Sequence, residues 1–185
     1  MISFRNSTTS WGAGSRALHW LGAALIAFLL GFGWWMTHLA DRSIRVDMYY
    51  LHSVVGYYFG LLLLLRLLWR GVDRTAPALP ADSKPWERWA AHGGHIALYG
   101  LMIAVTLTGW ILYSAFPRRI AATLFGVVPV PFLFAAPDRA ISRTMEKVHE
   151  FLSYALLVVV VIHVAAALRH HFVKHNDVLR RMWWA

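Results

Sequence analysis

Four long apolar stretches constrain this chain more than any other feature of its sequence. They cover residues 16–39, 48–70, 92–115 and 147–172, and each has sharp polar borders. A helix needs about 20 mostly apolar residues to cross the hydrocarbon core of a bilayer, where its backbone groups must be satisfied within the segment. The sequence therefore predicts an all-α membrane protein, a single domain over residues 1–185 built as a bundle of four transmembrane helices.

The composition is typical of a protein surrounded by lipid, because only 15% of residues are charged while 58% are hydrophobic. A formal net charge of +9 would favour nucleic acid as the partner of a soluble protein. Here the cations lie between the apolar stretches, so membrane lipid with anionic headgroups is the expected partner and no nucleic acid is expected. We interpret the arginines near the borders as interfacial anchors: Arg16, Arg66, Arg70 and Arg169.

The connecting segments predict the orientation. Of the 18 Lys and Arg residues, 11 lie on the side of both termini, and an excess of such residues marks the cytoplasmic side. Both termini are therefore expected in the cytoplasm. The outer connection, 116–146, contains an apolar stretch over 120–136 that is interrupted by Pro129 and Pro131. Because proline disrupts helices, we expect an interfacial or re-entrant segment there and no fifth span.

Histidines within the apolar stretches point to a functional site, because ionisable residues inside membrane spans usually face the bundle interior. His19 lies near the inner end of the first span, and His52 lies near the outer end of the second. The fourth span carries His149 near its outer end and His163 fourteen residues deeper. Fourteen residues rise about 21 Å in almost four whole turns, so both imidazoles share one face. Pairing by depth joins His52 with His149 and His19 with His163.

Two imidazoles that face each other across a bundle suit the two axial positions of haem iron. The chain has no cysteine, which excludes covalent haem attachment and iron–sulfur clusters. A hydrogen bond to a neighbouring helix is the alternative for any single histidine. Zinc is the rival metal for these histidines, although its sites use three or four close protein ligands. A histidine-lined metal transporter remains a further function class. The first prediction is two stacked haem b groups held non-covalently.

Other residues are predicted to support these sites. His92 and His95 lie one turn apart at the start of the third span, where they are expected to ligate the inner haem or to bond its propionates. Histidines at the span ends are expected to be solvated or lipid-facing: His38, His170, His171 and His175. Small residues allow close approach of helices or porphyrin, and the glycines in question are Gly31, Gly33, Gly56, Gly60, Gly100 and Gly109.

Six pieces of sequence carry a resemblance to a known family. They are RALHWL at 16–21, YLHSVVGY at 50–57, AHGGHIALYGLM at 91–102, TGWILYSA at 108–115, VHEFLSYALL at 148–157 and IHVAAALRHHFVKHNDVLRRM at 162–182. Over nearly its whole length the chain resembles the bacterial cytochrome b561 family, which is related to the cytochrome b subunits of nickel–iron hydrogenases and formate dehydrogenases. The resemblance implies a place in the bacterial inner membrane and axial haem ligation by the four residues His19, His52, His149 and His163.

The resemblance also implies transfer of electrons between a donor at one membrane face and quinone in the bilayer. One branch of the family resembles a superoxide oxidase, so we expect an oxidoreductase that passes electrons from an outer-side donor, such as superoxide, to ubiquinone. The alternative is a membrane anchor and electron relay subunit for a partner dehydrogenase or a periplasmic redox protein. Seven outer-side cations are expected to steer an anionic donor or to bind headgroups: Arg42, Arg45, Arg118, Arg119, Arg139, Arg143 and Lys147.

Overall fold

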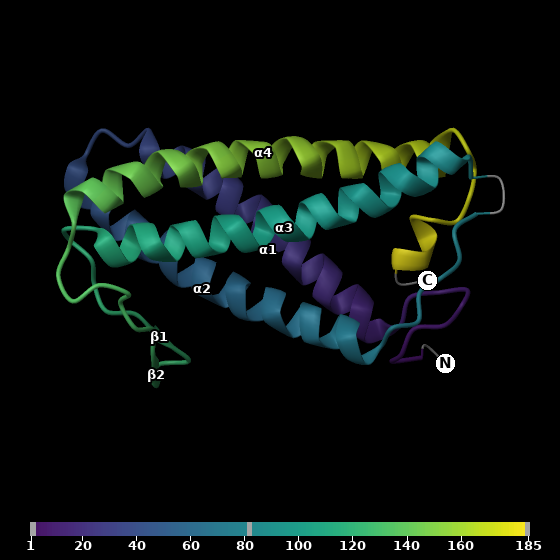
Figure 1. Ribbon diagram of the computed structural model, residues 1–185, viewed down its shortest axis with the longest axis horizontal. Coiled ribbons are helices and arrows are strands. Elements are labelled where there is room, and N and C mark those ends of the chain that lie inside the picture. The colour runs from purple at the N-terminus through teal and green to yellow at the C-terminus, as the bar shows by residue number, and fades with distance from the viewer. Residues whose placement is uncertain (1–2, 81–82, 184–185) are drawn as a thin grey trace.

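Four long helices dominate the computed structural model, which describes residues 3–80 and 83–183 (Figure 1). They are α1 (Ala13–Thr37), α2 (Arg42–Val72), α3 (Pro85–Ala115) and α4 (Arg139–Phe172). Each one is long and apolar enough to cross a membrane. The predicted four-helix membrane fold is confirmed, and all four helices begin before the predicted spans, by up to eight residues.

The early helix starts are due to polar residues that lie outside the apolar spans. Asp41 and Asp138 are the N-caps of α2 and α4, and each carboxylate accepts hydrogen bonds from two backbone N–H groups of the first turn. An Asp in this position satisfies donors that have no partner inside the helix. At the start of α3, the Glu87 carboxylate accepts a hydrogen bond from the N–H of Lys84. Apolar patterning detects only the lipid-spanning part of each helix.

The bundle is built from two helix pairs, α1 with α2 and α3 with α4, and α2 also packs against α3. Over the described ranges, α4 has no comparably close backbone packing with α1 or α2. Both termini lie at one end of the bundle, which we call the inner end. The α1–α2 turn and the β-hairpin lie at the opposite end, which we call the outer end (Figure 1).

A small buried cluster lies near the middle of the bundle and is contributed by all four helices. Its members are Ile26, Phe59, Leu63, Met102 and Leu156. Many large apolar side chains of the four helices are exposed; Leu64 and Val161, for example, are 52% and 58% exposed. An apolar exterior around a small apolar core is the distribution that lipid contact favours.

The outer connection folds into a hairpin over residues that the sequence marks as apolar. Strands β1 (Thr123–Leu124) and β2 (Val128–Pro129) pair antiparallel. Phe125 and Gly126 both have positive φ, 53° and 72°, as the central residues of a type I′ turn require. The N–H of Phe125 donates to the hydroxyl of Tyr58 on α2 at 2.8 Å. The hairpin therefore lies beside the outer half of the bundle, joined by this hydrogen bond to the middle of α2.

The inner end is closed by polar contacts between α3, α4 and the chain termini. Glu87 is buried and forms ion pairs with Arg169 at 3.1 Å and with Lys174 at 2.6 Å. The indole N–H of Trp20 donates to the carbonyl of Met182 at 2.8 Å. Met182 belongs to a short 3₁₀ helix, η1 (Arg180–Met182). The C-terminal segment thus returns to α1 and covers the inner end.

Candidate functional site

Two pairs of imidazoles face each other between the helix pairs. His52 on α2 and His149 on α4 have ring centroids 6.3 Å apart, and we call this pair the outer site. His19 on α1 and His163 on α4 also have ring centroids 6.3 Å apart, at what we call the inner site. All four side chains are half-buried. The structure places the four histidines in the pairs that depth predicts, and their role as ligands stays a prediction.

The spacing within each pair suits a metal ion between the two rings. A metal–imidazole nitrogen bond is about 2 Å and the ring centre lies roughly 1 Å behind the nitrogen, so two rings on opposite sides of one ion have centroids about 6 Å apart. Two histidines at this spacing would be able to hold a haem iron, whose remaining ligands would come from the porphyrin. The described residues contain no group of three or more His, Cys, Asp or Glu side chains placed to hold a metal ion. The donor set therefore fits haem better than zinc.

At the outer site, His149 is held in an orientation suited to a ligand. Its Nδ1 lies 3.1 Å from the carbonyl oxygen of Val105 on α3. A carbonyl only accepts, so this Nδ1 carries the proton and Nε2 keeps its lone pair. Metal-ligating histidines commonly donate their other N–H to a backbone carbonyl in this way. The Nδ1 of His52 is buried and has no hydrogen-bond partner in the described part of the chain.

Two glycines give the outer imidazoles their space. A Cβ added to Gly33 would lie 3.2 Å from Cε1 of His52, and one added to Gly109 would lie 3.0 Å from Cε1 of His149. Both distances are shorter than ordinary van der Waals contact, so any larger residue would press on the rings. A Cβ on Gly100 would meet no atom within 4 Å. Of the glycines that the sequence singles out, Gly33 and Gly109 contact the predicted ligands.

At the inner site, a third imidazole lies beside His163. The ring of His95 on α3 is 5.6 Å from that of His163, closer than the ring of His19. The Nδ1 of His95 donates to the carbonyl of Ala91 at 2.7 Å, which leaves its Nε2 free. His92, one turn earlier, is exposed. The inner site therefore offers two possible partners for His163, whereas the outer site offers His149 one.

Arg66 is the residue of the inner site that sequence reasoning missed. Its apolar neighbours predict an interfacial anchor, but its guanidinium lies 3.1 Å from Nδ1 of His19. Arg66 lies six residues before the end of α2 at Val72, and from there its guanidinium reaches the imidazole of His19 on α1. A signal was present in the sequence, since Arg66 follows His52 by fourteen residues, the same spacing that joins His149 to His163.

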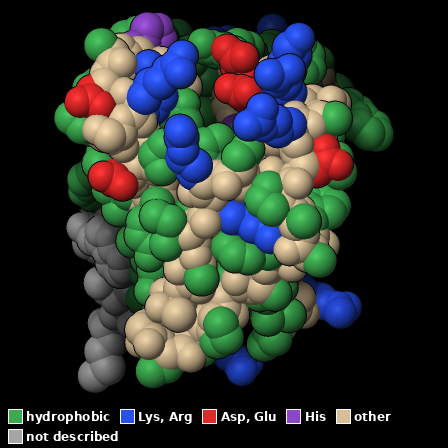
Figure 2. Space-filling view, turned by 90° about the vertical axis from the view of Figure 1, so that its left-hand side faces the viewer, with side chains coloured by type: hydrophobic (Ala, Val, Ile, Leu, Met, Phe, Trp, Pro, Cys, Tyr) green, Lys and Arg blue, Asp and Glu red, His purple; other side chains and the backbone are tan. Residues whose placement is uncertain are grey.

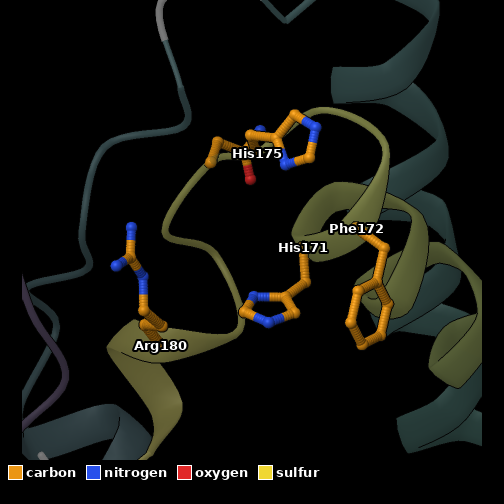
Figure 3. Close-up of a pocket in the computed structure, with 5 residues that line it drawn as sticks. His171, Phe172, His175 and Arg180 are labelled. Atoms are coloured by element: carbon orange, nitrogen blue, oxygen red, sulfur yellow. The ribbon is translucent and has the colours of Figure 1, made fainter.

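The histidines at the end of α4 lie apart from both pairs. His171 and His175 line a cavity of about 270 Å³ at the inner end, together with Phe172, Asn176 and Arg180 (Figure 3). His170 pairs through Nδ1 with the amide nitrogen of Asn176 at 2.9 Å. These positions are separate from the two imidazole pairs, although His171 follows His163 by only eight residues.

Four of the seven outer cations form two groups, and the other three, Arg139, Arg143 and Lys147, are exposed in the first turns of α4. Arg119 donates to the backbone carbonyls of Ser114, Phe134 and Ala135, and Arg45 donates to that of Leu39. These two arginines hold the outer connections in place. Arg42 and Arg118 instead line a cavity of about 470 Å³ with Ser43, Val46 and Asp47. Figure 2 looks onto this end and shows Lys and Arg side chains gathered near its upper edge with a few acidic ones between them.

Known proteins resemble this chain over nearly all of its length. Residues 10–185 match a family model described as prokaryotic cytochrome b561. Cytochrome b561 homolog 2 of Escherichia coli (strain K12) is 33% identical over 98% of this chain and 95% of that protein. Probable superoxide oxidase CybB of Yersinia pestis is 31% identical over 89% and 90%. Cytochrome b561 homolog 1 of E. coli (strain K12) is 25% identical over 89% and 92%.

Proposed function

This chain belongs to the prokaryotic cytochrome b561 family, and we propose that it is an oxidoreductase that passes electrons from an outer-side donor to membrane quinone. Members of this family are bacterial membrane electron-transfer proteins that bind haem b. The proposed donor is superoxide, supported by the similarity to the probable superoxide oxidase of Y. pestis. The proposed acceptor is ubiquinone. The protein lies in the inner membrane with both termini in the cytoplasm, as the distribution of Lys and Arg favours.

The observation that carries this proposal is the pair of equal imidazole spacings, 6.3 Å at each site. His52 with His149 would hold one haem b, and His19 with His163 would hold the other. When bound, each haem supplies a one-electron carrier. The hydrogen bond from His149 to Val105 keeps Nε2 of that histidine available for the iron, and His163 lies on the same face of the same helix.

The two sites are placed to serve opposite faces of the membrane. His149 and His163 are separated by about 21 Å of helix rise, which is a large part of a hydrocarbon core of about 30 Å. Between them, the buried cluster around Leu156 fills the middle of the bundle with apolar side chains from all four helices. This arrangement puts apolar side chains between the two sites and leaves each site near one end of the bundle.

The outer cavity supports an anionic donor. Arg42 and Arg118 line it with a single carboxylate, Asp47, and a cleft with an excess of one charge raises the local concentration of ions of the opposite sign. The cavity lies at the outer end, where α2 begins and the hairpin connection follows α3. His52 is ten residues further along α2. The outer site is therefore the one nearer to a donor that enters there.

The first test is the visible spectrum of the detergent-purified protein before and after dithionite, with haem counted as the pyridine haemochromogen. We expect b-type bands at two haems per chain, and we expect enzymatically generated superoxide to reduce ubiquinone when no other protein is added. A colourless protein, or one haem per chain, would contradict the two-site proposal. A two-haem protein that stays inert until a dehydrogenase or periplasmic redox protein is added would favour the relay function.

Charge at the outer cavity provides a second test. The double substitution Arg42→Gln with Arg118→Gln is expected to lower the rate of haem reduction by superoxide severalfold, because the two positive charges attract the anion. It should also weaken the dependence of this rate on ionic strength, because salt screens that attraction. Stopped-flow reduction of the haem bands measures both effects. Arg143→Gln, which removes one charge from the outer end but not from the cavity, is the control and should leave the rate nearly unchanged. An unaltered rate in the double variant would exclude this cavity as the route of entry.

A further inference from the structure

Arg66 occupies the place on α2 that corresponds to a histidine on α4. His52 and Arg66 are fourteen residues apart on α2, and His149 and His163 are fourteen apart on α4. Both helices therefore present their two residues on one face, almost four turns apart. At the outer level each helix contributes an imidazole, whereas at the inner level α4 contributes His163 and α2 contributes a guanidinium.

The contacts of Arg66 place its charge inside the inner site. Its Nη2 lies 3.1 Å from Nδ1 of His19, and its Cζ lies 5.4 Å from the ring centre of Tyr99. It is close enough to act electrostatically on His19, His95 and His163. No ion pair joins Arg66 to a carboxylate within residues 3–80 and 83–183. A cation inside a membrane bundle is costly, and such cations mark functional sites.

The contact with His19 conflicts with ligation of iron by the same residue. A guanidinium has only donors, so the contact needs a lone pair on Nδ1 of His19. A histidine that binds a metal through Nε2 carries its proton on Nδ1, and Arg66 then loses its acceptor. The described residues offer no anionic replacement, but haem b has two propionate carboxylates, and arginine binds carboxylates well.

We propose that Arg66 is the counter-charge of the inner haem, leaving Nδ1 of His19 and pairing with a propionate when haem binds. This inference rests on the proposed function, in which His19 and His163 are the inner ligands. Reduction adds one electron to the iron, forms and breaks no bond, and lowers the charge of the site by one. A neighbouring cation favours the reduced state, so Arg66 raises the reduction potential of the inner haem.

Within the described residues, no Lys or Arg side chain contacts the imidazoles of the outer site. The Nδ1 of His52 has no hydrogen-bond partner, and that of His149 lies 3.1 Å from the carbonyl oxygen of Val105 and 3.3 Å from the hydroxyl of Thr108. The outer imidazoles are packed against Gly33 and Gly109 instead of a cation. Removal of Arg66 should therefore change the potential of one haem and not the other, which separates a charge effect from a general loss of structure.

The test is a redox titration of the haem bands in Arg66→Gln and Arg66→Lys, with haem content measured in the same samples. We expect Arg66→Gln to keep both haems and to shift the reduction equilibrium of one of them at least about tenfold toward the oxidised form, which is about 59 mV for a one-electron couple. Arg66→Lys should restore most of the shift. Arg74→Gln, two residues beyond the end of α2 with its Nε donating to the carbonyl of Gly71 at 3.1 Å, is the control and should leave both potentials unchanged.

Repeating the titration in the His149→Ala background, where only the inner haem is expected, assigns the shift to the inner site. Full haem content with unchanged potentials in Arg66→Gln would overturn the inference. Arg66→Gln could lose the inner haem altogether. In that case, retention of the inner haem by Arg66→Lys supports the counter-charge, and loss of the inner haem from both variants overturns it. Wild-type protein that holds haem at the outer site alone would overturn the proposed function as well, so the two failures are distinct.

Discussion

The outer and inner sites share one spacing and differ in how the surrounding residues support it. At the outer site, His52 and His149 lie against glycine backbone, and a carbonyl of α3 fixes the ring of His149. At the inner site, His163 has two imidazole neighbours, His19 and His95, and a guanidinium lies beside His19. The outer site depends on close packing, and the inner site depends on charge and on a surplus of imidazoles.

This difference shows that equal ligand spacing does not imply equal sensitivity to substitution. A site that is packed against glycine has little room for added volume. A site with an internal cation and a third histidine tolerates loss of one polar group more easily but responds to changes of charge. The same kind of substitution is therefore expected to have unequal effects at the two ends of the bundle.

The largest expected effect is that of His149→Ala. The outer site has no third imidazole that would replace His149, so the haem content should fall from about two to one per chain. The remaining haem should keep the spectrum and potential of the inner site. His175→Ala, at the end of α4, is the control and should retain both haems. Retention of both haems by His149→Ala would refute the outer pairing.

Substitutions at the inner site test whether His95 or His19 is the ligand that acts together with His163. His163→Ala should remove the inner haem, because both candidate partners face this residue. His95→Ala should leave both haems in place, with His19 as the second ligand. Haem content and the low-spin ferric signal in electron paramagnetic resonance distinguish the cases. If His95→Ala removes the inner haem and His19→Ala does not, α3 supplies the inner ligand.

A smaller effect is expected from added volume at the outer site. Gly109→Val would place methyl groups against the ring of His149, where even a Cβ would lie 3.0 Å from Cε1, and overpacking of this kind typically costs about 1–3 kcal/mol. We expect a severalfold weaker retention of the outer haem, measured by haem loss to apomyoglobin. Gly100→Val on the same helix adds the same volume where no atom lies within 4 Å. Equal haem loss in both variants would show that the helix and not the site is affected.

The sequence predicts the four spans and the two levels of histidines because these depend on the length and geometry of single helices. Apolar length gives the spans, and a spacing of fourteen residues places His149 and His163 on one face at two depths. Which imidazoles meet across the bundle depends also on how the helices pack, and in the structure they meet in the pairs that depth predicts. The helix starts were less well predicted, because Asp41 and Asp138 begin α2 and α4 in polar segments that a search for apolar residues does not cover.

The features that the sequence did not predict depend on tertiary contacts. The hairpin donates a hydrogen bond to Tyr58, which is 67 residues earlier in the chain. Just beyond the hairpin, the carbonyl of Pro131 accepts one from Trp110 of α3. The different tasks of Arg118 and Arg119 follow from the fold of the connection around them, although they are adjacent in the chain. Arg66 was missed for another reason: its spacing from His52 was visible, but charge near the end of an apolar stretch normally indicates an interface.

Helix α4 also fixes the distance and the relative direction of the two sites. His149 and His163 lie on one unbroken helix, so the number of residues in the segment 150–162 sets both their difference in depth and the angle between their side chains. Deleting or inserting one residue there would rotate one imidazole relative to the other by about 100° and shift it by about 1.5 Å. No side-chain substitution restores such a rotation. Exposed positions of the segment are therefore open to changes of residue type, whereas a change of its length would misalign one of the two proposed sites.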